Sequence, residues 1–267
     1  MKNRFAFSVY LFLSFLFPLI GGEAMAEKGF PPGGSIPILL YHRFGPVVAD
    51  SMTMPTSVFE SHLQFLQDNA YKVIAIRELV DTYFKHGIPP TPRSVAITVD
   101  DGHISVYSDM LPLIKKYRIP VTLFLYPSAI SNASYAMSWE QLRKMKDTGL
   151  FDFQSHSYWH PNFKKEKERL KAAEYEKFVE MQLKKSKETL EKNLNSRVAM
   201  LAWPFGIYDG WLMAKAIEAG YGAAFTIDRR HAILSDQMTA LPRFLLTSTD
   251  RGKVFAGILA GGQSKGK

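Results

Sequence analysis

The sequence contains no cysteine. A disulfide framework, a thiolate metal site and a cysteine nucleophile are therefore excluded. A chain of 267 residues is long enough to bury a sizeable apolar core, so folding needs no such covalent links. Any metal site or catalytic site must be built from other side chains.

Long apolar runs are absent beyond the N-terminal segment. There, Lys2 and Arg4 precede the apolar residues 5–20, and a small-x-small triplet follows at residues 24–26. This order is typical of a secretory signal peptide. A bilayer span needs about 20 apolar residues, and Pro18 interrupts this shorter run, so we expect cleavage rather than an uncleaved anchor. The mature protein is then expected to be exported, either periplasmic or secreted, with no membrane span.

Acidic side chains are in the minority, because 25 Asp and Glu face 33 Lys and Arg, for a net charge of +8. Much of the excess lies in residues 164–192, where Lys and Glu are mixed. Such a run is typical of a solvated helix face. We therefore expect no nucleic-acid partner and at most a weak attraction to acidic polymers of the cell envelope.

Short apolar runs alternate with amphipathic stretches after a Pro/Gly-rich linker at residues 27–35. Nearly continuous apolar runs predict strands that are buried on both faces of a parallel sheet. About seven strand–helix units predict an α/β architecture in a single domain, and a closed or nearly closed barrel rather than a small open sheet. The predicted strands are 38–41, 73–74, 95–99, 121–125, 151–154, 198–202 and 223–227, and the predicted helices are 56–69, 76–84, 105–117, 138–148, 164–193 and 209–219.

Two adjacent carboxylates, Asp100 and Asp101, follow the predicted strand 95–99. In parallel barrels the reactive side chains lie at the C-terminal ends of strands. Adjacent carboxylates repel each other unless a cation or a proton intervenes. One aspartate can bind a metal ion while the other moves protons, and a solvated Asp-Asp-Gly turn is the alternative.

Two histidines, His156 and His160, follow the predicted strand 151–154. Neutral imidazole is a ligand that suits zinc and similar divalent ions. Two histidines and one aspartate leave coordination positions open, as in a catalytic zinc site and unlike a structural one. A pair of exposed loop histidines is the alternative.

A Pro/Gly turn at residues 202–206 (Ala-Trp-Pro-Phe-Gly) follows a third predicted strand. Pro204 and Gly206 together fix an unusual backbone path, because proline restricts φ and glycine permits positive φ. Such a loop can direct a backbone N–H at a developing oxyanion. Without the other motifs, a plain turn would be the preferred interpretation.

These three segments resemble the motifs of the polysaccharide deacetylase family, carbohydrate esterase family four. The closest resemblance is His-Ser-x-x-His-Pro at residues 156–161, and the likeness extends over residues 36–244. It implies a distorted parallel (β/α) barrel of about seven strand–helix units. The expected division of the chain is a signal peptide (1–26), a linker (27–35), a deacetylase domain (36–260) and a basic tail (261–267).

The resemblance also implies roles for individual residues. Asp100 would be the general base, the N–H of Phe205 would help to hold the oxyanion, and Ser157 would orient its loop. One divalent metal ion is implied, with zinc first and cobalt, nickel or iron as alternatives. Its ligands would be Asp101, His156 and His160.

The N-terminal part of the domain resembles one branch of the family. Residues 40–44 (Leu-Tyr-His-Arg-Phe) resemble a segment of the branch that includes poly-N-acetylglucosamine deacetylases, where the histidine, here His42, lies near the active site. A histidine packed at a strand end is the alternative.

Two features depart from the family pattern. Many members carry an arginine at the position of Ala202 to pair with the base, and Arg243 could supply that group from elsewhere. Many members also carry a late Leu-x-His motif whose histidine is the general acid. The only late histidine here is His231, in a polar stretch expected to be a loop, so the acid is unassigned.

The expected function is removal of N-acetyl groups from a polysaccharide that contains N-acetylglucosamine, with release of acetate. Alternatives are a peptidoglycan substrate, an O-acetyl ester, or a carbohydrate-binding barrel without catalysis. Tyr126, Trp159 and Trp203 lie near predicted loop ends and could stack on sugar faces, although aromatic residues more often serve the core. The partner is expected to be the acetylated polysaccharide, and the oligomeric state stays open.

Overall fold

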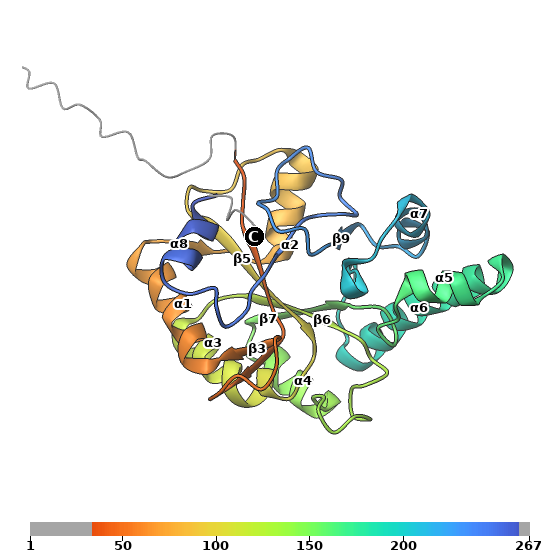
Figure 1. Ribbon diagram of the computed structural model, residues 1–267, viewed down its shortest axis with the longest axis horizontal. Helices are drawn as coiled ribbons and strands as arrows, with labels where there is room; N and C mark the ends of the chain where they lie inside the picture. The colour runs from red at the N-terminus through yellow and green to blue at the C-terminus, as the bar shows by residue number, and fades with distance from the viewer. Residues whose placement is uncertain (1–33, 262–267) are drawn as a thin grey trace, which may run out of the picture.

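The computed structural model describes residues 34–261 (Figure 1). The predicted signal peptide (1–26) lies outside the described residues, as do most of the linker and of the basic tail. Among residues 34–261, no helix combines the length and the apolar composition that a membrane span requires.

The centre of the fold is a parallel sheet with the strand order β10-β1-β5-β6-β7-β8-β9, to which β4 adds by pairing with β5. A separate pair, β2 and β3, lies beyond the C-terminal end of β1. The strands are β1 (Ile38–Tyr41), β2 (Arg43–Gly45), β3 (Thr53–Pro55), β4 (Lys72–Val73), β5 (Ser94–Asp101), β6 (Val121–Leu125), β7 (Phe151–Ser155), β8 (Met200–Ala202), β9 (Ala223–Phe225) and β10 (Phe244–Leu245).

Helices surround this sheet (Figure 1). The helical segment that begins with α2 continues as a π-helical turn (Val80–Phe84), a second such turn (Val106–Met110) leads into α3, and a single 3₁₀ turn (Pro204–Gly206) follows β8. The α-helices are α1 (Thr56–Asp68), α2 (Ile76–Leu79), α3 (Leu111–Tyr117), α4 (Trp139–Lys146), α5 (Phe163–Arg169), α6 (Ala172–Leu194), α7 (Gly210–Glu218) and α8 (Lys253–Leu259).

The predicted single-domain α/β barrel is confirmed, and its distortion lies between β9 and β10. These two edge strands do not pair with each other directly. Instead, the Leu241 N–H donates to the Ala224 carbonyl at 2.8 Å on one side, and Phe244 pairs with Leu39 of β1 on the other. An irregular stretch of chain therefore joins the two edges, and it carries Arg243.

Strand alternation decides which side chains point into the barrel. In β5, Val95, Ile97 and Val99 pack with the helices in one apolar cluster, whereas Ala96 belongs to a second cluster with residues of β8 and β9. Asp100 is four residues after Ala96 in the same strand, so its side chain points to the same face as Ala96, where the second, interior cluster lies. Its carboxylate therefore lies at the mouth of the barrel.

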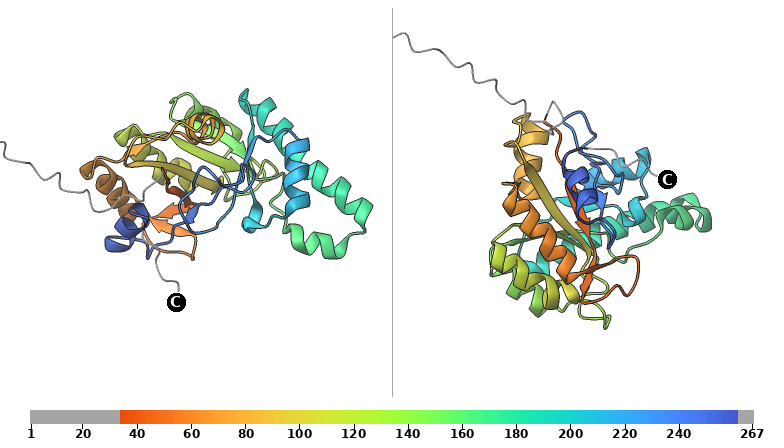
Figure 2. Two further views of the ribbon diagram at one scale, coloured as in Figure 1. Left: turned by 90° about the horizontal axis from the view of Figure 1, so that it is seen from above. Right: turned by 60° about the vertical axis from the view of Figure 1, so that its left-hand side comes forward.

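One predicted helix is wrong. The segment 164–193 forms two helices, α5 and α6, that lie side by side at one edge of the molecule (Figures 1 and 2). Leu170 and Lys171 between them are extended, with ψ of 149° and 154°. Leu170 packs against the core, and the Glu174 carboxylate accepts a hydrogen bond from the Lys171 N–H at 3.1 Å, which starts α6. Helix propensity is high throughout the segment, so this tertiary packing was not visible in the sequence.

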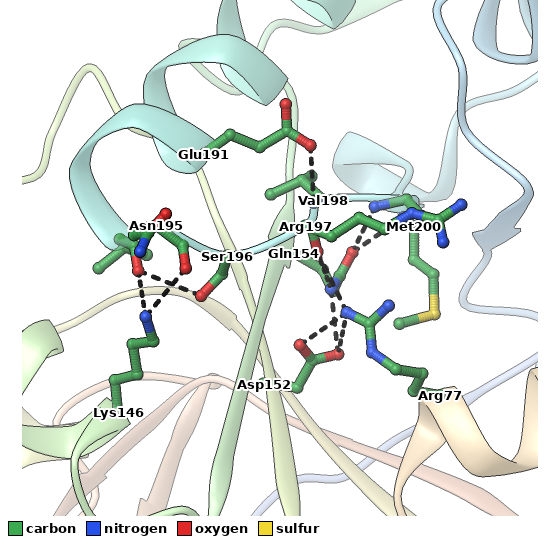
Figure 3. Close-up of polar contacts among 12 residues, drawn as sticks. Arg77, Lys146, Asp152, Gln154, Glu191, Asn195, Ser196, Arg197, Val198 and Met200 are labelled. Carbon is green, nitrogen blue, oxygen red and sulfur yellow. Dashed lines mark hydrogen bonds and ion pairs between the residues drawn. The ribbon is translucent and has the colours of Figure 1, made fainter.

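The start of β8 is held by a side chain rather than by strand pairing. β7 and β8 share a single register pair, Ser155 with Leu201. The buried Gln154 fills the gap, because its Oε1 accepts from the N–H groups of Ala199 and Met200, each at 2.9 Å. Its Nε2 donates to the Asp152 carboxylate at 3.0 Å, as Figure 3 shows. Gln154 therefore fixes the strand that ends in the third motif.

Candidate active site

The three predicted metal ligands lie together at the C-terminal ends of β5 and β7. Asp101 Oδ1 is 3.7 Å from His156 Nε2 and 3.8 Å from His160 Nε2. All the donor atoms of this cluster lie within 4.8 Å of one another. Two ligands of one tetrahedral zinc ion, each at about 2.0–2.2 Å, are about 3.3–3.6 Å apart. Asp101, His156 and His160 could therefore hold a metal ion.

The chemistry of the two imidazoles fits a cation. Burial lowers the pKa of His156 to about 3 and also lowers that of His160. Both rings are therefore neutral at pH 7, which is the form that binds metals. His156 Nδ1 lies 2.8 Å from the Ala202 carbonyl, which only an N–H can satisfy. That contact fixes the tautomer and leaves the Nε2 lone pair directed at the cluster.

The backbone at the cluster is unusual. Asp101, Ser157 and His160 all have positive φ, between 61° and 75°, a region that non-glycine residues rarely occupy. The Ser157 hydroxyl accepts a hydrogen bond from the His160 N–H at 3.2 Å, which holds the loop between the two histidines. Gly102 has φ of 83°, and a Cβ there would lie 2.8 Å from the Leu125 side chain. Strain of this kind concentrates at functional sites.

Asp100 lies beside the cluster and is paired with Arg243. The guanidinium donates to both carboxylate oxygens, at 2.8 and 2.7 Å, and both side chains are at most 2% exposed. Burial is the largest influence on Asp100 and opposes its ionisation, but Arg243, His156 and His42 together outweigh it, and the pKa of Asp100 is lowered to about 2. Asp100 is therefore ionised at neutral pH, with one oxygen 3.7 Å from His156 Nε2.

Asp101 is perturbed in the opposite direction. Burial raises the pKa of its carboxyl group, while His42 acts against that shift. The two neighbouring aspartates thus differ in environment, as the sequence analysis anticipated for residues with different tasks.

His42 follows β1, the strand next to β5. Tyr41 pairs with Val99, so His42 is level with Asp100. Its Nδ1 is buried and has no hydrogen-bond partner among the described residues. Burial lowers the pKa of His42, and the charges of Asp100 and Asp101 act in the opposite direction, which means that His42 lies within electrostatic reach of the cluster.

His231, the late histidine, lies elsewhere. Its Nδ1 is 3.2 Å from the Ser35 hydroxyl and its Nε2 is 2.6 Å from the Ile258 carbonyl. Both ring nitrogens are occupied away from the metal cluster, so His231 does not take the place of the missing late histidine.

Phe205 lies against the cluster, with its ring 4.5 Å from the His160 ring. Its φ is 57°, and its side chain is 56% exposed. Gly206, with φ of 66°, permits this turn, because a Cβ there would lie 2.5 Å from the Ile227 side chain. The turn thus carries the backbone of Phe205 to the side of His160.

The three aromatic residues expected at the sugar site differ in their exposure and position. The prediction that Trp203 stacks on a sugar is wrong, because Trp203 is completely buried and its Nε1 donates to the Thr239 carbonyl at 2.9 Å. The local Pro/Gly pattern gave no sign that the residue before Pro204 turns into the core. Trp159 is 47% exposed, and the Tyr126 ring lies 5.5 Å from the His160 ring.

Two residues at this edge, His103 and Tyr135, were not predicted from the sequence. Their rings are nearly parallel, with centroids 6.3 Å apart. The available signal was position, since both lie in loops that follow strands ending at the cluster, β5 and β6.

Comparisons with known proteins agree with this geometry. The family model for polysaccharide deacetylase matches residues 87–224. A poly-beta-1,6-N-acetyl-D-glucosamine N-deacetylase of Staphylococcus epidermidis is 28% identical over 194 residues, which are 71% of this chain and 66% of that protein. The chain thus spans just under two thirds of the length of this relative.

Solved structures share the fold. The Streptococcus pyogenes deacetylase PplD in complex with acetate superposes with a TM-score of 0.75 at 22% identity, covering 84% of this chain and 98% of that one. IcaB from Ammonifex degensii gives a TM-score of 0.73 at 22% identity, covering 85% and 98%. Together with the family model, which matches more than half of the chain, these likenesses show that the protein belongs to the polysaccharide deacetylase family.

Proposed function

We propose that this protein is a metal-dependent hydrolase that removes N-acetyl groups from a polysaccharide containing N-acetylglucosamine and releases acetate. The observation that carries the proposal is the cluster of Asp101, His156 and His160 beside the buried pair of Asp100 and Arg243. The cluster offers three metal ligands and leaves coordination positions open, and Asp100 is an ionised carboxylate beside it. A structural metal site is closed by a fourth protein ligand and needs no such neighbouring base.

Asp101, His156 and His160 would hold one divalent ion, zinc first, with cobalt, nickel or iron as alternatives. Such an ion polarises the substrate carbonyl and lowers the pKa of water. The second carboxylate, Asp100, is the general base that accepts a proton from the attacking water. Arg243 holds Asp100 in place and keeps it ionised, so it acts as a positioning residue.

Two further groups complete the proposed mechanism. The backbone N–H of Phe205 donates a hydrogen bond to the oxyanion of the tetrahedral intermediate. His42, whose ring is neutral at pH 7 because burial lowers its pKa, passes on to the departing amine the proton that Asp100 accepts from the attacking water. Its unpartnered Nδ1 and the influence of both aspartates on its pKa support this role.

The substrate is inferred from relatives. The staphylococcal relative is named for poly-β-1,6-N-acetylglucosamine, and residues 40–44 resemble the same branch, so we propose an N-acetylglucosamine polymer. Trp159 and Tyr126 would contact it. The sequence of residues 1–26 supports export to the periplasm or to the outside, where such polymers occur. Residues 36–260 would form the deacetylase domain, and no nucleic acid is expected as a partner.

Acetate release tests the proposal. The protein is incubated with oligomers of β-1,6-linked and β-1,4-linked N-acetylglucosamine, with peptidoglycan fragments, and with an O-acetylated sugar. Each reaction is run with and without a chelator, followed by zinc add-back. We expect the highest kcat/KM with an N-acetylglucosamine oligomer, loss with chelator, and recovery with zinc. Preference for peptidoglycan or the O-acetyl ester would reassign the substrate. Binding without acetate release at any metal supplement would favour a carbohydrate-binding barrel.

A further inference from the structure

An exposed aromatic ring that the sequence analysis did not single out lies beside the metal cluster. Tyr135 is 47% exposed and belongs to the loop between β6 and α4, residues 126–138. A single exposed aromatic ring is common on a folded protein and by itself indicates nothing. What distinguishes this ring from a mobile surface side chain is the set of contacts that hold it in one position.

The ring of Tyr135 is held from two sides. One side faces the His103 ring, with centroids 6.3 Å apart and planes inclined by 13°. Its hydroxyl makes a hydrogen bond of 2.9 Å with the Tyr126 hydroxyl. The Tyr135 carbonyl accepts from the Ile104 N–H at 2.7 Å. A ring fixed in this way loses little conformational freedom when a ligand stacks on it.

The loop that carries Tyr135 is fastened to both backbone segments that hold the metal ligands. The Met137 N–H donates to the Gly102 carbonyl at 3.0 Å, directly after Asp101. The Ser128 N–H donates to the Tyr158 carbonyl at 3.0 Å, between the two histidines. The position of the Tyr135 ring is therefore fixed relative to the cluster.

The strand order places exposed aromatic rings on both sides of the histidines. The loop after β7 carries His156 and His160, and β7 lies between β6 and β8. Tyr135 follows β6, and Phe205, which is 56% exposed, follows β8. A polymer that is bound across the cluster would pass the loops that carry both rings.

We propose that Tyr135, supported by His103, is a stacking platform for the sugar ring next to the one that is deacetylated. This inference rests on the proposed function. The C–H face of a neutral pyranose packs well on an aromatic ring, and Tyr135 offers such a face without a charged neighbour stacked on it. The platform would favour oligomers over single sugars and would recognise the chain rather than the acetyl group.

Variants of Tyr135 test the platform. Acetate release is measured for a pentamer and a monomer of N-acetylglucosamine, and hydrolysis of a small aryl acetate is measured in the same preparations. In Tyr135→Ala we expect the pentamer/aryl acetate ratio of kcat/KM to fall about tenfold, mainly through KM, as expected for loss of one aromatic stacking contact. Tyr135→Phe should keep the ratio within about twofold, because the ring remains. Zinc content per chain confirms that each variant is folded.

Ile217→Ala is the matched control, since Ile217 is also an exposed apolar residue, on α7, and it should change neither ratio nor zinc content. An unchanged ratio in Tyr135→Ala would overturn the platform. So would an equal loss in Tyr135→Phe, because the hydroxyl pair with Tyr126 would then be the important feature. If the wild-type protein releases acetate from the aryl ester but from no oligomer, the proposed function has failed, and that result is distinct from either outcome above.

Discussion

Arg243 and Asp100 are 143 residues apart in the sequence, yet they form a buried two-point ion pair at the mouth of the barrel. Many members of the family are expected to carry the partner of the base at the position of Ala202. Here the irregular segment between β9 and β10 supplies it. The path of that segment therefore gives Asp100 a cationic partner, which favours the ionised form of its carboxyl group.

Loss of this pair should affect both stability and activity. In Arg243→Met, Asp100 is left as an unpaired buried carboxylate, which should lower the free energy of unfolding by about 3–5 kcal/mol. The pKa of Asp100 should rise, so the acid limb of the kcat profile should move to higher pH. Arg243→Lys should recover part of this shift, because a lysine keeps the charge but not the two-point contact. Denaturant titration and pH–rate profiles measure the two effects.

A surface pair provides the comparison. Lys85 and Asp81 form an ion pair in which both side chains are about half exposed. Lys85→Met should change the free energy of unfolding by less than about 1 kcal/mol and leave the pH profile in place. Equal behaviour of the two variants would contradict the role given to Arg243.

Metal binding and proton transfer should separate by mutation. Ala substitution at Asp101, His156 or His160 should remove zinc from the protein, as measured by metal analysis after dialysis, and with it acetate release. Asp100→Asn should keep zinc binding and lose most of kcat, because the amide cannot accept the proton from water. If Asp100→Asn retains full activity, the base has been assigned to the wrong residue.

The role of His42 can be tested by comparing substrates that have different leaving groups. An amine must be protonated before it departs, whereas an activated phenol departs as an anion. His42→Gln should therefore lower kcat for an N-acetyl substrate by about 10²–10⁴-fold, and lower it far less for an aryl acetate. An equal loss with both substrates would indicate that His42 only positions its neighbours. His86→Gln, at an exposed position just after the π-helical turn Val80–Phe84, is the control.

The strand-end motifs could be predicted from the sequence because parallel strands bring their C-terminal ends to one edge. Asp101 after β5 and the histidines after β7 meet for that reason. What the sequence did not reveal depends on packing between distant segments. The burial of Trp203 and the break at Leu170 are set by the core, not by local pattern. Tyr135 was missed because its one available signal, a position in a loop after a predicted strand, is shared by many other loop residues.

The amide of Gln154 should matter for stability, because it replaces strand pairing between β7 and β8. In Gln154→Leu the N–H groups of Ala199 and Met200 lose their acceptor. Each unsatisfied buried group costs about 1–3 kcal/mol, so the loss of two acceptor contacts should lower the free energy of unfolding by about 2–6 kcal/mol. Gln64→Leu, at an exposed position of α1, should have little effect. A negligible change in Gln154→Leu would mean that the backbone finds other partners.

Acid should destabilise the metal-free protein, and the histidines set where this begins. Burial lowers the pKa of His156 to about 3 and that of His62 to about 4, whereas an unfolded chain has histidine pKa values of about 6.5. Between these values the unfolded chain binds protons that the folded chain does not, so the free energy of unfolding falls as pH decreases below about 6.5. Asp100 acts in the same direction at lower pH, because its folded pKa of about 2 lies below its unfolded value of about 3.9. Denaturant titrations at pH 7, 6 and 5 should show this decline. Saturating zinc should raise the free energy of unfolding at each pH but leave the contribution of His156 to the decline, because that ring is already unprotonated in the folded protein over this range. A free energy of unfolding that stays constant from pH 7 to pH 5 would show that these rings are protonated in the folded protein.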